Sequence, residues 1–145
     1  MRILLIGGGK SGKSTMAQRL GAALSGDAPR YYWATMTPHD DEDLARIRRH
    51  VADRAGMDFI PVERSFDLPA ALPALDWHGT VLFDSGTACL SEQMFPGPAP
   101  DADAANRVLR ELLDISRYLD HFIAVCDDIW HGGEDYRDWT EVYVR

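Results

Sequence analysis

Apolar runs and helical segments alternate along this chain of 145 residues. Bulky apolar residues cluster in four runs that we interpret as strands: residues 2–6, 30–35, 80–84 and 121–126. Apolar residues recur every three or four positions in three segments that we interpret as helices: residues 16–24, 40–54 and 104–119. Strands that alternate with helices are typical of an α/β protein with a mostly parallel sheet covered by helices.

Proline and turn residues mark the weaker segments. Residues 58–63 fit a short strand, which Pro61 confines to an edge or an end of the sheet. Residues 68–75 fit a broken helix, and residues 96–103, rich in Pro, Ala and Asp, fit an exposed loop. Residues 140–145 fit a final strand, whose edge a second copy of the chain could cover in a homo-oligomer.

The apolar faces of two helices predict their packing. The helix at residues 104–119 gathers four apolar side chains on one face: Val108, Leu112, Ile115 and Leu119. The helix at residues 40–54, which Thr37, Asp40 or a neighbour should cap, carries a stripe of Leu44, Ile47 and Val51. We expect both faces to pack against the core.

The clearest chemical signal lies between the first strand and the first helix. Residues 2–6 read as a buried strand, and residues 7–14 fit the P-loop pattern G-x-x-x-x-G-K-[S/T]. Gly7 and Gly12 permit backbone angles and a close approach that let successive N–H groups hold phosphate oxygens. Lys13 would bring positive charge to the β- and γ-phosphates, and the Ser14 hydroxyl would ligate Mg²⁺. The predicted nucleotide-binding segment is Gly7, Gly8, Gly9, Lys10, Ser11, Gly12, Lys13, Ser14 and Thr15.

The alternative is a glycine-rich turn that matches the pattern by chance. The apolar strand before the loop and the amphipathic helix after it disfavour that interpretation, because a P-loop needs both.

Asp84 is the best candidate for the second ligand of a Mg²⁺–nucleotide site. It ends an apolar strand, and we expect that strand to neighbour the first one and to bring its carboxylate near Ser14. The alternative is an ordinary aspartate that caps the next helix, since Ser85 and Thr87 follow at once.

A polar stripe follows the helix at residues 40–54. Asp43, Arg46, His50 and Arg54 recur at spacings of three and four. Because positive charge on both sides disfavours imidazolium, we expect His50 to be neutral and nucleophilic. The two arginines could pair with phosphates. On spacing alone, a solvated surface histidine is the simpler interpretation.

Length and composition restrict the function classes. The length fits one domain, and a net charge of −8, from 15 Lys and Arg against 23 Asp and Glu, disfavours nucleic acid as a partner. No apolar run is long enough to span a membrane, so we expect a cytoplasmic protein. Cys89 and Cys126 lie far apart with no metal-ligand spacing, which favours reduced core residues.

Four segments together resemble the bifunctional adenosylcobinamide kinase/adenosylcobinamide-phosphate guanylyltransferase family of cobalamin synthesis. Residues 7–14 and 32–36 (Y-W-A-T-M) are similar to its P-loop and second strand. Residues 41–54 resemble its acidic segment followed by R-I-x-x-H-x-x-x-R. Residues 81–84 (V-L-F-D), followed by Thr87, resemble its strand that ends in Asp.

The resemblance implies a P-loop NTPase-type, RecA-like fold and a two-step enzyme. It implies that His50 carries GMP covalently and that Lys13 and the rest of the P-loop hold the nucleotide. Glu63 and Asp84 would complete the surroundings of the nucleotide and Mg²⁺, together with Arg46 and Arg54. The implied substrates are GTP or ATP and a corrinoid.

The C-terminal part departs from the family pattern. Residues 127–130 read D-D-I-W where the family has N-E-V-G, and the family's G-R-x-N-Q helix does not follow residues 136–138. A shortened relative that binds nucleotide or corrinoid without turnover is therefore a second interpretation. An unrelated small-molecule kinase is a third, although it leaves the R-I-x-x-H-x-x-x-R segment unexplained.

Overall fold

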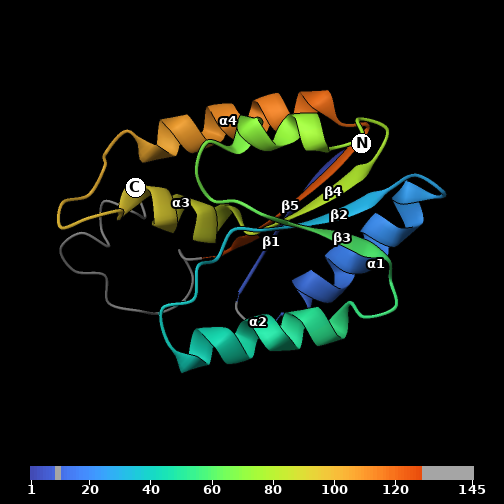
Figure 1. Ribbon diagram of the computed structural model, residues 1–145, viewed down its shortest axis with the longest axis horizontal. Helices are drawn as coiled ribbons and strands as arrows, with labels where there is room; N and C mark the ends of the chain where they lie inside the picture. The colour runs from blue at the N-terminus through green and yellow to red at the C-terminus, as the bar shows by residue number, and fades with distance from the viewer. Residues whose placement is uncertain (9–10, 129–145) are drawn as a thin grey trace.

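Five strands, all parallel, form one sheet in the order β1-β5-β4-β2-β3 (Figure 1). The structure is a computed structural model, and it describes residues 1–8 and 11–128. The strands are β1 (Arg2–Gly7), β2 (Arg30–Ala34), β3 (Phe59–Glu63), β4 (Thr80–Asp84) and β5 (His121–Asp127). The helices are α1 (Lys13–Ser25), α2 (Asp41–Asp53), α3 (Gly86–Met94), α4 (Ala104–Tyr118) and the 3₁₀ helix η1 (Leu68–Ala74).

The sheet confirms the α/β class and most of the expected elements. β3 lies at an edge, where the missing N–H of Pro61 interrupts hydrogen bonding least. The segment expected as a broken helix is η1, which contains Pro73. The expected final strand at residues 140–145 lies outside the described residues.

The position of β1 corrects two predictions. β1 is not buried, because Leu4 and Ile6 are 59% and 63% exposed. It is also not the neighbour of β4, since β5 lies between them. The physical reason is the burial of β5, in which Phe122 to Val125 are all buried. A strand that is buried in this way needs a neighbouring strand on each side and cover over both faces of the sheet.

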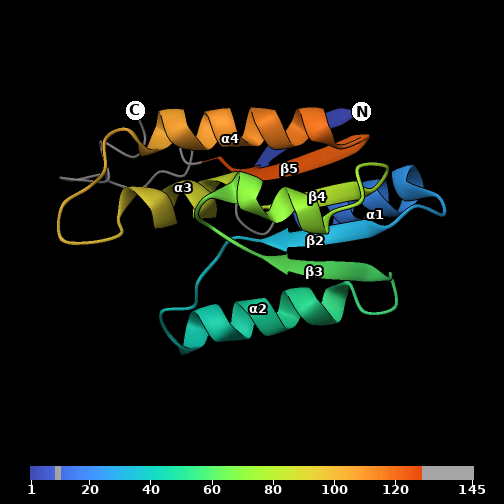
Figure 2. The ribbon, with the colours of Figure 1, turned by 45° about the horizontal axis from the view of Figure 1, so that its top comes forward.

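Helices cover the two faces of the sheet unequally (Figure 2). On one face α3, α4 and η1 pack over a core that includes Trp33 and Phe83, both fully buried. The Trp33 indole N–H donates to the Arg64 carbonyl oxygen at 2.8 Å, so its polar atom is satisfied. The predicted face of α4 is confirmed, with three buried residues and one partly buried: Val108, Ile115, Leu119 and Leu112. On the other face α1 packs over a smaller core that includes Tyr32.

Helix α2 lies beside the β2–β3 edge and does not join either core (Figure 2). Its predicted cap is confirmed, because the Asp40 carboxylate accepts a hydrogen bond from the Asp43 N–H at 2.8 Å. The prediction for its apolar stripe is wrong. None of its residues is buried, and Leu44 and Val51 remain 38% and 50% exposed. The stripe is instead available to line a cavity.

Both cysteines are free, as expected, but only Cys89 is a buried core residue, and Cys126 is partly exposed. Burial raises the pKa of the Cys89 thiol to about 12, and burial also raises the pKa of Cys126. Within the described residues, none of the helices has the length and apolar character needed to cross a bilayer.

Candidate functional site

The carboxyl ends of the strands bring the predicted site residues to one edge of the sheet (Figure 1). Gly7 of β1 pairs in register with Asp127 of β5. Ala34 of β2 lies in register between Asp84 of β4 and Glu63 of β3. Open α/β sheets bind ligands at this edge, because the loops after all their parallel strands meet there.

The loop between β1 and α1 contains one described position, Gly12, whose backbone favours glycine. Gly12, the residue before α1, has a φ of +82°, which an L side chain rarely adopts. A Cβ on Gly7 would lie 2.8 Å from the Ser11 hydroxyl oxygen, so the Ser11 side chain would have to move to admit it. Ser14 and Thr15 lie in the first turn of α1. Gly9 and Lys10 lie outside the described residues.

Lys13 is held by groups on both sides of the loop. Its amine donates to the Gly8 carbonyl oxygen at 3.0 Å and pairs with the Asp127 carboxylate at 2.7 Å. Asp127 also accepts a hydrogen bond from the Thr87 hydroxyl at 3.2 Å, which links the P-loop to the start of α3. Sequence reasoning did not single out Asp127. The available signal was its place directly after a buried strand, which is the signal that identified Asp84.

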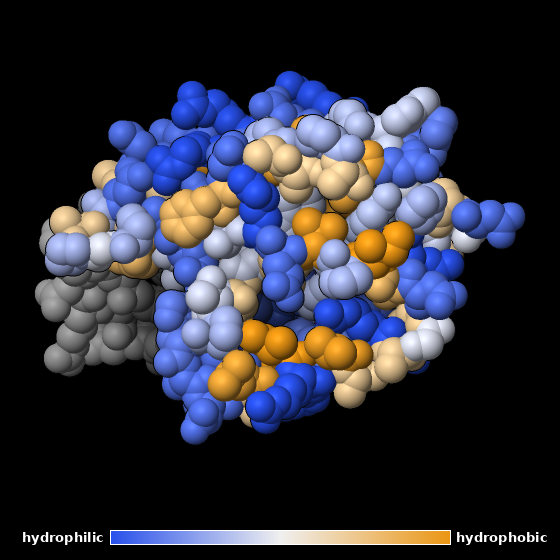
Figure 3. Space-filling model, viewed as in Figure 1, coloured by the Kyte–Doolittle hydropathy of each residue, from blue (hydrophilic) through white to orange (hydrophobic). Residues whose placement is uncertain are grey.

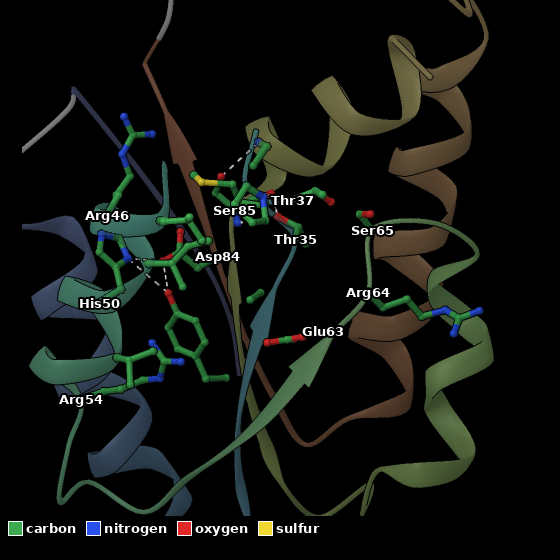
Figure 4. A pocket seen from close by; sticks show the side chains of 18 residues that line it. Thr35, Thr37, Arg46, His50, Arg54, Glu63, Arg64, Ser65, Asp84 and Ser85 are labelled. Atoms are coloured by element: carbon green, nitrogen blue, oxygen red, sulfur yellow. Dashed lines mark hydrogen bonds and ion pairs between the residues drawn. The ribbon is translucent and has the colours of Figure 1, made fainter. Parts of the chain in front are cut away.

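Asp84 is the centre of the site (Figure 4). Its Oδ2 accepts a short hydrogen bond from the Tyr32 hydroxyl and lies 3.5 Å from His50 Nδ1. Burial alone would raise the pKa of the Asp84 carboxyl. The hydrogen bonds from His50 and Tyr32 outweigh burial, with help from the charge of Lys13, and the pKa lies below its ordinary value. Asp84 is therefore a carboxylate that connects α2 to the sheet.

These contacts correct the expected surroundings of His50. The imidazole does not lie simply between two arginines, because Asp84 of a different element faces its Nδ1. The Arg54 guanidinium lies 3.7 Å from the centre of the Tyr32 ring, a cation–π contact. Helical spacing counted only the charges on the same helix and could not include a carboxylate from β4.

Tyr32 is a second site residue that sequence reasoning missed, because it read as one more aromatic of a buried strand. Its hydroxyl lies 3.5 Å from His50 Nδ1 and donates to Asp84. Burial and the neighbouring carboxylate raise the pKa of this phenol well above its ordinary value, so it stays protonated.

The interpretation of Asp84 as a helix cap is wrong. Ser85 caps α3, since its hydroxyl accepts a hydrogen bond from the Ala88 N–H at 3.1 Å. The end of β4 is also tied to β2. The Thr35 hydroxyl donates to the Ser85 carbonyl oxygen at 2.8 Å and accepts from the Ser85 N–H at 3.0 Å. None of these bonds uses the Asp84 carboxylate, which instead contacts Tyr32 and His50.

A cavity of about 470 Å³ lies between α2 and the carboxyl edge of the sheet, within the range of small-molecule sites. Figure 3 shows apolar residues gathered along the α2 side of this hollow, and Figure 4 shows the polar side chains around it. The expected site residues His50, Arg46, Arg54, Glu63 and Asp84 all line it. Arg64 also contributes to the lining, but its guanidinium pairs with Asp67 at 3.7 Å and points away from the other site residues in Figure 4.

The Asp84 carboxylate and the Ser14 hydroxyl are chemically suited to Mg²⁺. The contacts of Asp84 with Tyr32 and His50 both use Oδ2, which leaves the lone pairs of Oδ1 for another ligand. A carboxylate and the Ser14 hydroxyl are the hard oxygen ligands that Mg²⁺ takes beside phosphates and water. In residues 1–8 and 11–128, no three His, Cys, Asp or Glu side chains cluster as a metal centre of their own.

A parallel sheet with a glycine-rich loop before α1 and an acidic residue at the end of a central strand defines the P-loop NTPase-like class. A sequence profile for cobinamide kinase / cobinamide phosphate guanyltransferase matches residues 3–144. The chain belongs to this family, which implies a kinase/guanyltransferase-type transferase of cobalamin biosynthesis. A search of curated proteins gives no match.

Proposed function

We propose that the protein phosphorylates adenosylcobinamide with GTP or ATP and then transfers GMP from GTP to the adenosylcobinamide phosphate. The observation that carries the proposal is the contact of His50 with Asp84 in the cavity, where the charge of Lys13 also acts on Asp84. A histidine held by a carboxylate next to a phosphate site is the arrangement expected of a nucleophile in group transfer.

In the kinase step, the residues from Gly7 to Thr15 hold the triphosphate. The N-terminus of α1 and the Lys13 amine offset its negative charge. Ser14 and Asp84 would hold Mg²⁺, which would neutralise charge on the β- and γ-phosphates. A hydroxyl oxygen of the corrinoid bonds to the γ-phosphorus and loses its proton to water. The bond from that phosphorus to the bridging oxygen breaks, and the nucleoside diphosphate leaves with the electron pair.

In the guanylyl step, a lone pair of His50 forms a nitrogen–phosphorus bond to the α-phosphorus of GTP. The bond from that phosphorus to the bridging oxygen breaks, and pyrophosphate leaves with the electron pair. The positive charge that develops on the imidazole is offset by the Asp84 carboxylate at 3.5 Å. A phosphate oxygen of adenosylcobinamide phosphate then displaces His50 from phosphorus, so two easier transfers replace one difficult transfer.

The lining of the cavity suits the remaining parts of the substrates. Arg46 and Arg54 supply charge for phosphates, and the Glu63 carboxylate can accept hydrogen bonds from a nucleobase. The apolar stripe of α2, formed by Leu44, Ile47 and Val51, offers a wall for a nucleobase or for the corrinoid.

The test is to incubate the pure protein with GTP labelled at the α-phosphate and Mg²⁺, and to measure label retained on the denatured chain. We expect retained label in the parent protein and none in His50→Ala. A nitrogen–phosphorus bond should be labile in acid and stable in base, unlike a serine ester. His78→Ala is the matched control and should label like the parent, because His78 lies just before β4, at the amino ends of the strands. The absence of label from the parent at every GTP concentration would contradict the guanylyl step.

A second candidate function is nucleotide or corrinoid binding without turnover. The ion pair between Lys13 and Asp127 favours it, because the amine that would contact phosphates is already engaged. This candidate predicts nucleotide affinity without retained label.

The same ion pair predicts that Asp127→Asn strengthens nucleotide binding. The substitution releases Lys13 and removes a carboxylate that repels phosphates, while an amide can still accept from Thr87. Because Asp127 is half exposed, we expect a gain of about three- to tenfold in GTP affinity that shrinks as salt rises. Calorimetry at two salt concentrations checks it. Asp120→Asn, at the other end of β5, controls for net charge, and weaker binding by Asp127→Asn would show that Asp127 supports the nucleotide.

A further inference from the structure

A buried phenol lies beneath the candidate nucleophile. Tyr32 is 4% exposed, its ring meets the edge of Phe59, and the Arg54 guanidinium covers its face. Its hydroxyl reaches the two groups that the proposed guanylyl transfer needs, Asp84 and His50. Figure 4 shows His50 and Asp84 facing each other, with Arg54 further along the chain from His50. A tyrosine that only filled the core would not require a hydroxyl here.

The hydrogen bonds at this point determine which nitrogen of His50 carries its proton. A phenol has one proton to donate, and the Tyr32 hydroxyl donates it to Asp84 Oδ2, which as a carboxylate oxygen can only accept. Both atoms that lie 3.5 Å from His50 Nδ1, the Tyr32 oxygen and Asp84 Oδ2, therefore present lone pairs to it. A neutral imidazole has one N–H and one lone pair. Its Nδ1 must be the N–H, and its lone pair must lie on Nε2.

We propose that Tyr32 is a positioning residue that holds the Asp84 carboxylate against Nδ1 of His50 and so presents Nε2 as the nucleophile. This inference rests on the proposed guanylyl transfer and adds the atom that attacks. The Nε2 lone pair forms the bond to phosphorus, the Nδ1 proton stays on the ring, and pyrophosphate takes the electrons of the broken bond.

Tyr32→Phe removes this hydrogen bond and little else. The phenylalanine ring keeps the contacts with Phe59 and the Arg54 guanidinium. Without its donor, Asp84 loses its fixed orientation, and His50 loses the bias toward the Nδ1–H form. We therefore expect label from GTP to appear on His50 about 10- to 100-fold more slowly, as is typical when a residue behind a reacting ligand is removed. GTP affinity should stay within about twofold of the parent value, because in the described part of the chain the Tyr32 hydroxyl bonds to His50 and Asp84 and not to residues 7–15.

Tyr31→Phe is the matched control. Tyr31 is the preceding residue on β2, is 6% exposed, and faces the opposite core. Its hydroxyl accepts a hydrogen bond from the Asp76 N–H at 2.9 Å, so the substitution also costs one buried hydrogen bond. A purely structural role for Tyr32 would make the two variants alike in stability and in labelling rate.

The decisive measurement is the ¹⁵N spectrum of histidine-labelled protein at a pH where His50 is neutral, with His50→Ala used to assign the signals. We expect a protonated Nδ1 and an unprotonated Nε2 in the parent and in Tyr31→Phe, and a mixture of tautomers in Tyr32→Phe. A protonated Nε2 in the parent would overturn the inference, even if the variant did not fold. Unchanged tautomer and labelling rate in folded Tyr32→Phe would overturn it as well.

These outcomes separate the inference from the proposed function. A parent protein that never takes up label refutes guanylyl transfer, whereas the spectrum still decides what Tyr32 does to His50. A parent that labels normally, with a tautomer that does not depend on Tyr32, refutes only the inference.

Discussion

Lys13→Ala is expected to weaken binding of GTP and ATP about 100-fold while the fold stays intact. A hydrogen bond from a charged amine to a phosphate is stronger than one between neutral groups. We therefore expect the Lys13 amine to contribute on the order of 3 kcal/mol to the binding free energy. Nothing else among the described residues replaces this amine in the loop between β1 and α1. Calorimetry with GTP and Mg²⁺, beside thermal unfolding of the same samples, measures the two effects separately.

The fold should tolerate the loss of Lys13. Its ion-pair partner, Asp127, is half exposed, so water can solvate the carboxylate that is left behind. Arg19→Ala removes an exposed positive charge from the same helix and is the control for net charge. If Lys13→Ala bound GTP as tightly as Arg19→Ala, residues 7–15 would not be a phosphate site.

The sequence was most informative where a residue's role is set by its immediate neighbours. The left-handed φ of Gly12, the cap at Asp40 and the edge position of Pro61 each depend on the backbone of one turn or one strand. Local chemistry of this kind can be read from residue type and spacing. For the same reason, the motif at residues 7–14 marked the loop between β1 and α1.

The sequence was least informative about which strands lie side by side. The apolar run of β1 resembled a buried strand, yet β1 lies at the edge of the described sheet, with Leu4 and Ile6 exposed. The order of parallel strands depends on how long crossovers pack over the whole sheet. No periodicity in a single strand encodes that order.

The candidate site shows the same difference between local and long-range information. His50, Asp84 and Glu63 were each singled out from the sequence, but how their side chains lie relative to one another was not. Spacing placed His50 between arginines of its own helix, whereas the group facing its Nδ1 comes from β4. Tyr32 was missed because a tyrosine in a strand usually satisfies its hydroxyl elsewhere in the core. Only the packing of α2 beside β2 reveals which polar group it meets.

For the apolar stripe of α2, the helix face was predicted correctly but its packing partner was not. Leu44, Ile47 and Val51 do lie on one face of the helix, as predicted, and that face lines the cavity instead of the core. Hydrophobic periodicity shows that a helix has a preferred face, but it cannot distinguish a permanent partner from a ligand.

Asp84→Asn is the other substitution from which we expect a large effect. It removes a negative charge that the proposal uses in both the kinase step and the guanylyl step. The amide oxygen can still accept from Tyr32, so the fold should survive. It can no longer offset positive charge on His50 or hold Mg²⁺ as a carboxylate does. We expect guanylylation of His50 to slow by about 100-fold or more.

The pattern across variants makes this prediction specific to Asp84. In Asp84→Asn, Mg²⁺ should no longer strengthen GTP binding, as measured by affinity with Mg²⁺ and with a chelator. His50→Ala should lose label yet keep the full response to Mg²⁺, and Tyr32→Phe should slow labelling with that response intact. Asp114→Asn, an exposed charge on α4, should change neither property. If Asp84→Asn kept the Mg²⁺ response and lost only labelling, Asp84 would be a partner of His50 alone, and the cation would have to be held by Ser14 and the phosphates without it.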